Sequence, residues 1–188
     1  LRKHKIQALG PNCLGLLDTH SGIDTLFLPR YRMKRPKQGS ISFISQSGIV
    51  GCTLLDLMSE RGYGFSKFIS YGNAVVIDES DILQFLADDP TTKVICLYLE
   101  GIKEGKKFLE IAKKIKKPII AIKGGITEKG SEATISHTGT LAGNAEIYKG
   151  AFKQTDIILA ESLEDMFNYA RILEACIQPK GNRVQIIT

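Results

Sequence analysis

Short apolar runs alternate with helix-like segments along most of the chain. Runs of this kind occupy residues 41–45 (ISFIS), 65–70 (FSKFIS), 94–100 (VICLYLE), 118–124 (PIIAIKG) and 156–160 (DIILA). Such short and apolar runs are typical of parallel strands that helices cover on both faces. Five such strands, each followed by a helix-like segment, predict an α/β fold with a doubly wound parallel sheet.

The segments between these runs carry the residue spacing of amphipathic helices. In the lysine-rich segment 103–118, the lysines fall on one face and the apolar residues on another. Ser162 and Asp165 resemble a capping box at the start of the last helix. Helices are therefore expected at residues 48–61, 80–88, 103–118, 144–154 and 162–177.

The charge balance favours small anionic ligands over nucleic acid. The net charge is +5, and lysine dominates the basic residues. Aromatic residues do not interleave with them, as a base-stacking surface requires, so we interpret the lysines of 103–118 as a solvated helix face. A basic balance still suits phosphate or a nucleotide. No apolar run approaches the length of a membrane span, and the basic start lacks a signal-peptide core, so no membrane partner is expected.

The four cysteines point to a reducing environment. They are Cys13, Cys52, Cys96 and Cys176, and none belongs to a CxxC pair or a Cys/His cluster with zinc spacing. No metal site is therefore expected. Cys96 lies in a strand-like run and Cys176 on an apolar helix stripe, so both are expected to be reduced core residues. A cytoplasmic location fits best.

Ligands of doubly wound folds bind at the carboxyl ends of the strands, which singles out the loops at that edge. After the first strand, SQSG (45–48) places Ser47 as an N-cap, and the start of the following helix favours an anion. Serine and glycine also occur at such turns for capping alone, so this motif leaves both interpretations open. The loops at 71–81, 100–105 and 124–144 are expected beside it.

One of these loops, SEATISHTGTLAGN (131–144), surrounds a histidine with small residues. The small neighbours leave the imidazole of His137 approachable, and Gly139 and Gly143 let the backbone come close to a ligand. Beside an anion site, such a histidine can act as a general base or as a nucleophile that takes a phosphoryl group. The residues alone leave these two roles open.

Four motifs together resemble one enzyme family. GPNCLG (10–15), SISFISQSG (40–48), YLEGIKEG (98–105) and SHTGTLAG (136–143) are similar to motifs of the NDP-forming acyl-CoA synthetases. That family includes the ADP-forming acetyl-CoA synthetases and, more distantly, the α subunit of succinyl-CoA synthetase. The resemblance covers nearly the whole chain and implies a flavodoxin-like ligase domain. Gln46 stands where the succinyl branch tends to have arginine, which points toward the acetyl-type branch.

The resemblance implies a chemistry for the histidine loop. Acyl-CoA, ADP and phosphate would interconvert with acid, CoA and ATP through an acyl phosphate and a phosphohistidine at His137. Glu100 would hydrogen-bond the other ring nitrogen of that histidine, as the carboxylate of a catalytic triad does. The implied phosphate-binding residues are Ser47, Gly48, Ile49 and Gly139. The implied residues near the pantetheine end of CoA are Gly10, Pro11 and Asn12.

The same resemblance divides the chain and names its partners. Residues 1–38 would be the tail of a CoA-binding Rossmann domain with a linker, 39–180 the flavodoxin-like ligase domain, and 181–188 the first strand of a further domain. The chain starts without methionine, so an N-terminal part is expected to be missing. A separate ATP-grasp domain or β subunit would bind ATP or ADP with Mg²⁺, and an oligomer is expected.

A second interpretation differs in function. Ligase-like modules of this kind also occur fused to protein acyltransferases, where they bind a ligand without turnover. The presence of His137 and Glu100 favours the synthetase, because a pure sensor has no need of a phosphoryl acceptor. We further expect Gly72, Asn73 and Asp78 to line the site.

Overall fold

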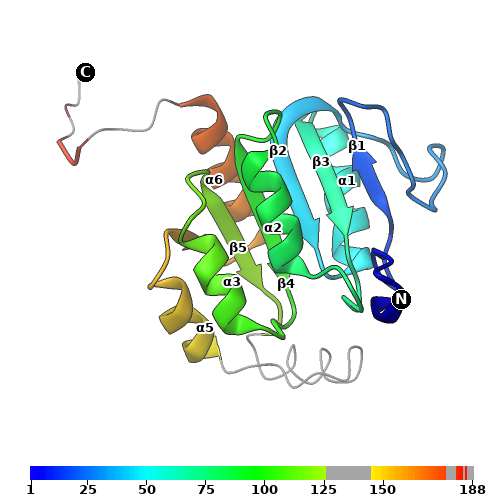
Figure 1. Cartoon of the computed structure of the whole chain (residues 1–188). Helices are drawn as coiled ribbons and strands as arrows, with labels where there is room; N and C mark the ends of the chain where they lie inside the picture. The colour runs from blue at the N-terminus through cyan, green and yellow to red at the C-terminus, as the bar shows by residue number, and fades with distance from the viewer. Residues whose placement is uncertain (126–144, 177–180, 184, 186–188) are drawn as a thin grey trace.

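The computed structural model describes residues 1–125, 145–176, 181–183 and 185. Within them, six strands form one sheet in the order β1-β3-β2-β4-β5-β6 (Figure 1). Strands β2 to β6 are parallel, whereas β1 runs antiparallel to β3. The strands are β1 (Leu16–Asp18), β2 (Lys37–Ser45), β3 (Gly64–Ser70), β4 (Val94–Leu99), β5 (Ile119–Lys123) and β6 (Ile157–Leu159).

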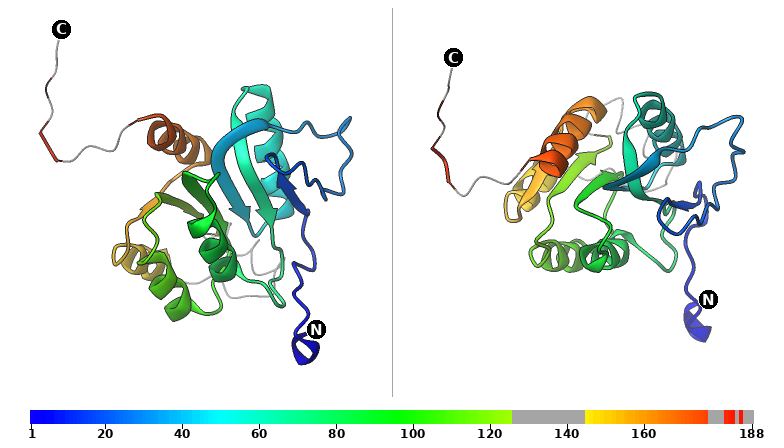
Figure 2. Two further views of the ribbon diagram at one scale, coloured as in Figure 1. Left: turned by 45° about the horizontal axis from the view of Figure 1, so that its top comes forward. Right: turned by 90° about the horizontal axis from the view of Figure 1, so that it is seen from above.

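Helices cover both faces of this sheet, as Figure 2 shows from above. Because side chains of a strand alternate between faces, neighbours such as Phe43 and Ile44 enter two different cores, and both are fully buried. The first core packs under α1 (Gly48–Glu60) and α6 (Leu163–Ala175). The second packs under α2 (Glu79–Asp88), α3 (Gly105–Ala112) and α5 (Ala145–Phe152). A short 3-10 helix, η1 (Arg2–His4), lies at the N-terminus.

The predicted doubly wound α/β architecture is confirmed, with one addition and two differences. The addition is β1, which the apolar pattern does not predict. Helix α3 ends at Ala112, although the predicted helix extends to residue 118. Cys176 is exposed at the C-cap of α6, so its predicted place in the core is wrong, whereas Cys96 is fully buried. Of residues 181–188, which were predicted to be the first strand of a further domain, four lie outside the described residues, namely 184 and 186–188.

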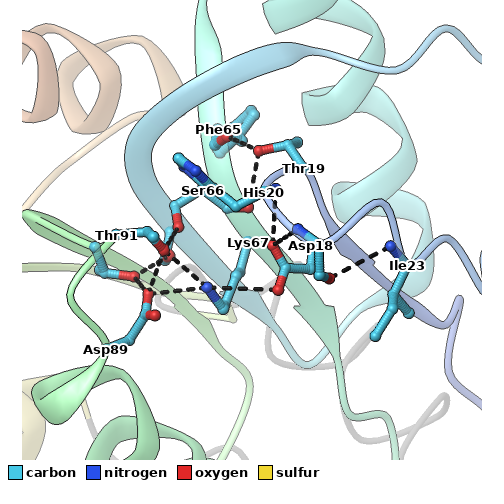
Figure 3. A network of polar contacts seen from close by, with 12 residues as sticks. Asp18, Thr19, His20, Ile23, Phe65, Ser66, Lys67, Asp89 and Thr91 are labelled. Atoms are coloured by element: carbon cyan, nitrogen blue, oxygen red, sulfur yellow. Dashed lines mark hydrogen bonds and ion pairs between the residues drawn. The ribbon is translucent and has the colours of Figure 1, made fainter.

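A buried lysine fixes the antiparallel edge strand to the rest of the domain (Figure 3). Lys67 of β3 is 7% exposed, and its ammonium lies 3.6 Å from the Asp18 carboxylate of β1 and 3.0 Å from that of Asp89. Burial alone would raise the pKa of Asp89, but hydrogen bonds from Thr92, Lys67 and Thr91 outweigh it and lower the pKa to about 2. The lysine therefore joins β1, β3 and the end of α2.

Candidate functional site

The carboxyl ends of the central strands meet at one edge of the sheet. Ser45 pairs with Ser70 of β3 and with Tyr98 of β4. The Gly124 N–H after β5 donates to the Leu99 carbonyl at 2.7 Å. The loops that follow β2, β3, β4 and β5 therefore begin side by side, as the sequence predicted.

The loop after β2 leads directly into the N-terminus of α1. Ser47 is the N-cap, and its hydroxyl accepts a hydrogen bond from the Val50 N–H at 3.4 Å, which confirms the predicted cap. Among the described residues, apart from its chain neighbours and the backbone of α1, no atom lies within 4 Å of the position that a Cβ on Gly48 would take. The first turn of α1 also contains no acidic residue. Its N–H groups can therefore receive an anion, which the helix dipole would favour.

A second part of the site comes from the N-terminal segment, which runs beside the loop after β3. The Asn73 N–H donates to the Pro11 carbonyl, and the Val75 N–H donates to the Gly10 carbonyl, each at 3.0 Å. Gly72 has a φ of +55°, and a Cβ there would lie 2.2 Å from the Asn12 carbonyl oxygen. Only glycine fits this position, and the two loops consequently hold each other in place.

Gln46 connects the start of α1 to the loop that carries Glu100. Its side-chain oxygen accepts hydrogen bonds from the Glu100 N–H at 2.7 Å and the Gly101 N–H at 3.0 Å. A guanidinium has only donors, so an arginine could not accept these two N–H groups. Glutamine at this position therefore fixes the backbone of the loop after β4 in a way that arginine could not.

Together these elements enclose a cleft of about 700 Å³. Its size is within the usual range of small-molecule sites. The polar part of the lining contains Asn12, Gln46, Ser47, Gly48, Gly72, Asn73, Glu100 and Lys103. The remaining lining residues are Cys13, Leu14, Phe27, Ile49, Cys52 and Val75.

Several titratable groups are buried beneath the loops of this edge. Burial raises the pKa of Glu79, at the start of α2, to about 7. The nearby negative charge of Asp78 raises this pKa further, whereas the positive charges of Lys103 and Lys107 lower it. Tyr71 is fully buried, and its hydroxyl has no hydrogen-bond partner among the described residues. Its pKa is raised by burial and then by the negative charges of Glu79 and Glu100.

Lys123 ends β5 and is 3% exposed. Its ammonium donates to the Gly124 carbonyl and lies 4.9 Å from the centre of the Tyr148 ring. Burial lowers the pKa of this lysine, and the charge of Glu100 counteracts part of that shift. A buried cation therefore contributes a positive field to the Glu100 side of the site.

The structure brings together five of the predicted site residues: Asn12, Ser47, Gly48, Ile49 and Glu100 line the cleft. Gly10 and Pro11 flank it through the carbonyls described above. His137 and Gly139 lie outside the described residues.

Gly72 and Asn73 line the cleft as expected, but Asp78 does not. Asp78 caps α2, where its carboxylate accepts from the Ser80 and Asp81 N–H groups and pairs with Lys107 at 3.1 Å.

Seven further residues line the cleft that were not predicted as site residues from the sequence, namely Cys13, Leu14, Phe27, Gln46, Cys52, Val75 and Lys103. Cys52 lies one helical turn beyond Ile49, so the face of α1 would have indicated it. Lys103 and Val75 belong to loops that were predicted at this edge. Phe27 lies in an irregular segment without any periodic pattern, and no feature of the sequence indicated its position.

Neither a metal cluster nor a membrane span is present in the described part of the chain. There, no group of three or more histidine, cysteine, aspartate or glutamate side chains could hold a metal ion. Over the same residues, no helix combines the length and apolarity that crossing a membrane requires.

Curated relatives share much of this sequence. The α subunit of acetate–CoA ligase [ADP-forming] II from Pyrococcus furiosus is 44% identical over 188 residues, which are 99% of this chain and 40% of that protein. Acetate–CoA ligase [ADP-forming] from Methanocaldococcus jannaschii is 42% identical over 189 residues, covering 100% of this chain and 26% of that protein. The chain thus spans less than half the length of these relatives.

A solved structure and a family model identify the fold further. The dinucleotide forming acetyl-coenzyme A synthetase 1 of Candidatus Korarchaeum cryptofilum, in complex with phosphate and ADP, superposes with a TM-score of 0.87 and 38% identity. The match covers 96% of this chain and 39% of that one. The family model of the succinyl-CoA ligase like flavodoxin domain matches residues 38–173, well over half of the chain. The chain therefore belongs to the family of succinyl-CoA ligase like flavodoxin domains.

Proposed function

We propose that the chain is part of an ADP-forming acyl-CoA synthetase of the acetyl type, and that it carries the residues that transfer the phosphoryl group. The whole enzyme would interconvert acyl-CoA, ADP and phosphate with acid, CoA and ATP. One observation carries the proposal: the cleft joins the open N-terminus of α1, Glu100 and the Asn12 loop in a member of this domain family. The relatives named as ADP-forming acetate–CoA ligases support the same reaction class.

In this proposal, the first turn of α1 holds phosphate, and one oxygen of that phosphate attacks the thioester carbonyl of acyl-CoA. The carbon–sulfur bond breaks, CoA leaves, and an acyl phosphate forms. A ring nitrogen of His137 then attacks the phosphorus, and the acid leaves as a carboxylate. Neutral imidazole is nucleophilic near pH 7, which suits this step. The N–H groups at Ser47 to Ile49 stabilise the negative charge on the phosphoryl oxygens throughout.

Glu100 acts as the orienting carboxylate in this scheme. Its backbone N–H is fixed by Gln46 at 2.7 Å, so the side chain starts from a defined position at the cleft. A carboxylate that accepts from one ring nitrogen of a histidine sets the tautomer and stabilises the charged ring. Glu100 would therefore prepare His137 for attack and stabilise the phosphorylated ring.

CoA would approach from the Asn12 side. The loop of Gly10, Pro11 and Asn12 presents its backbone and one amide side chain at the cleft, next to Gly72. ATP or ADP with Mg²⁺ would bind to an ATP-grasp domain, either elsewhere on the whole chain or on a β subunit. We also propose that the whole enzyme is an oligomer. No described residue of this chain is assigned to the nucleotide.

Steady-state kinetics of the complete synthetase test the proposal. With acetyl-CoA, phosphate and ADP, the wild type should form ATP. Glu100→Gln should slow ATP formation on the order of tenfold to a thousandfold, because altering the partner of a functional histidine has effects of this size. Glu104→Gln is the matched control, since Glu104 is exposed in the same loop and does not line the cleft. Wild-type rates in both variants would contradict the role of Glu100, and no ATP formation by the wild type would contradict the proposed reaction.

A further inference from the structure

One charged side chain at the functional edge has no part in the mechanism proposed above. Lys123 ends β5, and the four strand residues before it, 119–122, are apolar and buried. Lys123 itself is 3% exposed. Its ammonium donates to the neutral Gly124 carbonyl and faces the Tyr148 ring, and neither contact neutralises the charge. Because a buried cation is costly, its presence at this edge points to a functional role.

The register of the sheet places Lys123 beside the loop that carries Glu100. Lys123 pairs with Leu99, the last residue of β4, in the parallel ladder. The Gly124 N–H then donates to the Leu99 carbonyl at 2.7 Å. Glu100 follows Leu99 directly, so the lysine and the carboxylate come from adjacent strands at the same edge of the sheet.

Tyr148 of α5 joins the lysine to this loop. The Tyr148 hydroxyl accepts a hydrogen bond from the Ile102 N–H at 3.0 Å. The centre of its ring lies 4.9 Å from the Lys123 ammonium, a distance at which a cation is attracted to an aromatic face. One side chain thus contacts both the ammonium and the loop after β4, which fixes the ammonium relative to that loop.

The titratable groups around Glu100 differ in charge. Burial raises the pKa of Tyr71, Tyr98 and Tyr148, so these hydroxyls stay neutral near pH 7. Burial lowers the pKa of Lys123, and the negative charge of Glu100 opposes that shift. The attraction is mutual, so the ammonium of Lys123 also favours the ionised form of Glu100.

We propose that Lys123 is a positioning residue for phosphoryl transfer, whose ammonium keeps Glu100 ionised so that the carboxylate can accept from the ring of His137. This inference rests on the proposed function. An ionised carboxylate only accepts hydrogen bonds, whereas a protonated one also donates. The ionised form therefore selects one tautomer of the histidine and stabilises its charged ring.

The test measures phosphorylation of the complete synthetase by ATP that is radiolabelled in the γ-phosphate, in a single turnover between pH 5 and pH 8. Lys123→Met removes the charge and keeps the length of the side chain. The acid limb of its pH–rate profile should move to higher pH by on the order of one unit, so that labelling on this limb is about tenfold slower. The KM for CoA should stay unchanged. Lys123→Arg keeps the charge and should retain the wild-type limb.

Lys117→Met is the matched control, because it removes a cation at the other end of β5. Lys117 lies six residues before Lys123, roughly 20 Å along an extended chain, and its ammonium donates to the Leu86 and Asp89 carbonyls. The acid limb of this variant should stay in place. Glu79 and Lys103, which also carry charge at the functional edge, are identical in every variant, so their effects cancel in the comparison.

A double-mutant cycle shows whether the lysine acts through Glu100. In a Glu100→Gln background, Lys123→Met should cause no further shift, because the carboxylate on which it acts is gone. A shift that persists in this background would overturn the inference. So would a wild-type limb in Lys123→Met, or an equal shift in Lys123→Arg, and each of these results leaves the proposed function intact. No label on a wild-type enzyme that turns over would overturn the proposed phosphohistidine and this inference with it.

Discussion

Glu79 offers a direct test of the electrostatics beneath the site. It begins α2, is 3% exposed, and its pKa is raised by burial from 4.5 to about 7. The folded state therefore holds the proton more tightly than the unfolded state does, so stability falls as the pH rises from about 4.5 to about 7. Each pH unit of that interval lowers the free energy of unfolding by about 1.4 kcal/mol. Above pH 7, ionised Glu79 therefore lowers the free energy of unfolding by about 3 kcal/mol.

Glu79→Gln removes this cost because glutamine stays neutral and has nearly the same shape. At pH 5 the variant and the wild type should have similar free energies of unfolding. At pH 8 the variant should be more stable by up to about 3 kcal/mol. Urea unfolding followed by circular dichroism between pH 5 and pH 8 measures the difference, and the titration of all other groups cancels in the comparison.

A matched control separates burial from the general effect of an acidic first turn. Glu164 is an exposed glutamate in the first turn of α6. Glu164→Gln should change stability by no more than about 0.5 kcal/mol, with no gain toward pH 8. If the difference between Glu79→Gln and the wild type were the same at pH 5 and pH 8, the assigned effect of burial on the Glu79 carboxylate would be wrong.

Two further predictions concern the parts that hold the site and the sheet together. Gly72→Ala should displace the Asn12 loop, because the new Cβ would meet the Asn12 carbonyl at 2.2 Å and position 72 has a left-handed conformation. The KM for CoA should therefore rise more than the KM for phosphate. Equal changes in both KM values would contradict the predicted role of that loop. Asp89→Asn should destabilise the domain by about 3 kcal/mol at pH 7, because it leaves the buried Lys67 ammonium without one of its carboxylates. Because the pKa of Asp89 is low, the wild type should lose its extra free energy of unfolding over the variant as the pH falls from about 4 toward 2. If the difference in free energy of unfolding between variant and wild type stayed unchanged over that interval, the assigned Asp89–Lys67 ion pair would be refuted.

The architecture was predictable because the parallel strands contain buried apolar runs. Residues 41–45 of β2 and nearly all of β4 and β5 are buried on both faces, so their sequences contrast sharply with the polar segments around them. β1 was not predicted, since Leu16–Asp18 is short, ends in an aspartate and depends on pairing with β3. Cys176 continues an apolar stripe, but α6 ends at Ala175, and Cys176 is its exposed C-cap.

The polar part of the site was predictable for a topological reason, and the apolar part was not. Parallel strands bring their carboxyl ends to one edge, so the order of strands and helices along the chain is enough to place Ser47 and Glu100 together. Phe27 reaches the cleft through an irregular segment, whose path only tertiary packing determines. Glu79 lies in the polar stretch 78–81 (DESD), where nothing in the sequence distinguishes a buried carboxylate from an exposed one.

Label transfer tests most directly whether the enzyme carries the phosphoryl group on His137. The complete synthetase would be incubated with Mg²⁺ and ATP that is radiolabelled in the γ-phosphate, and the labelled residue would then be mapped. The wild type should carry an acid-labile, alkali-stable label on His137, and added ADP should remove that label by re-forming ATP. His137→Ala should lose both the label and acyl-CoA synthesis while it still binds CoA. A label on another residue, or no label under conditions where the wild type turns over, would contradict the phosphohistidine mechanism.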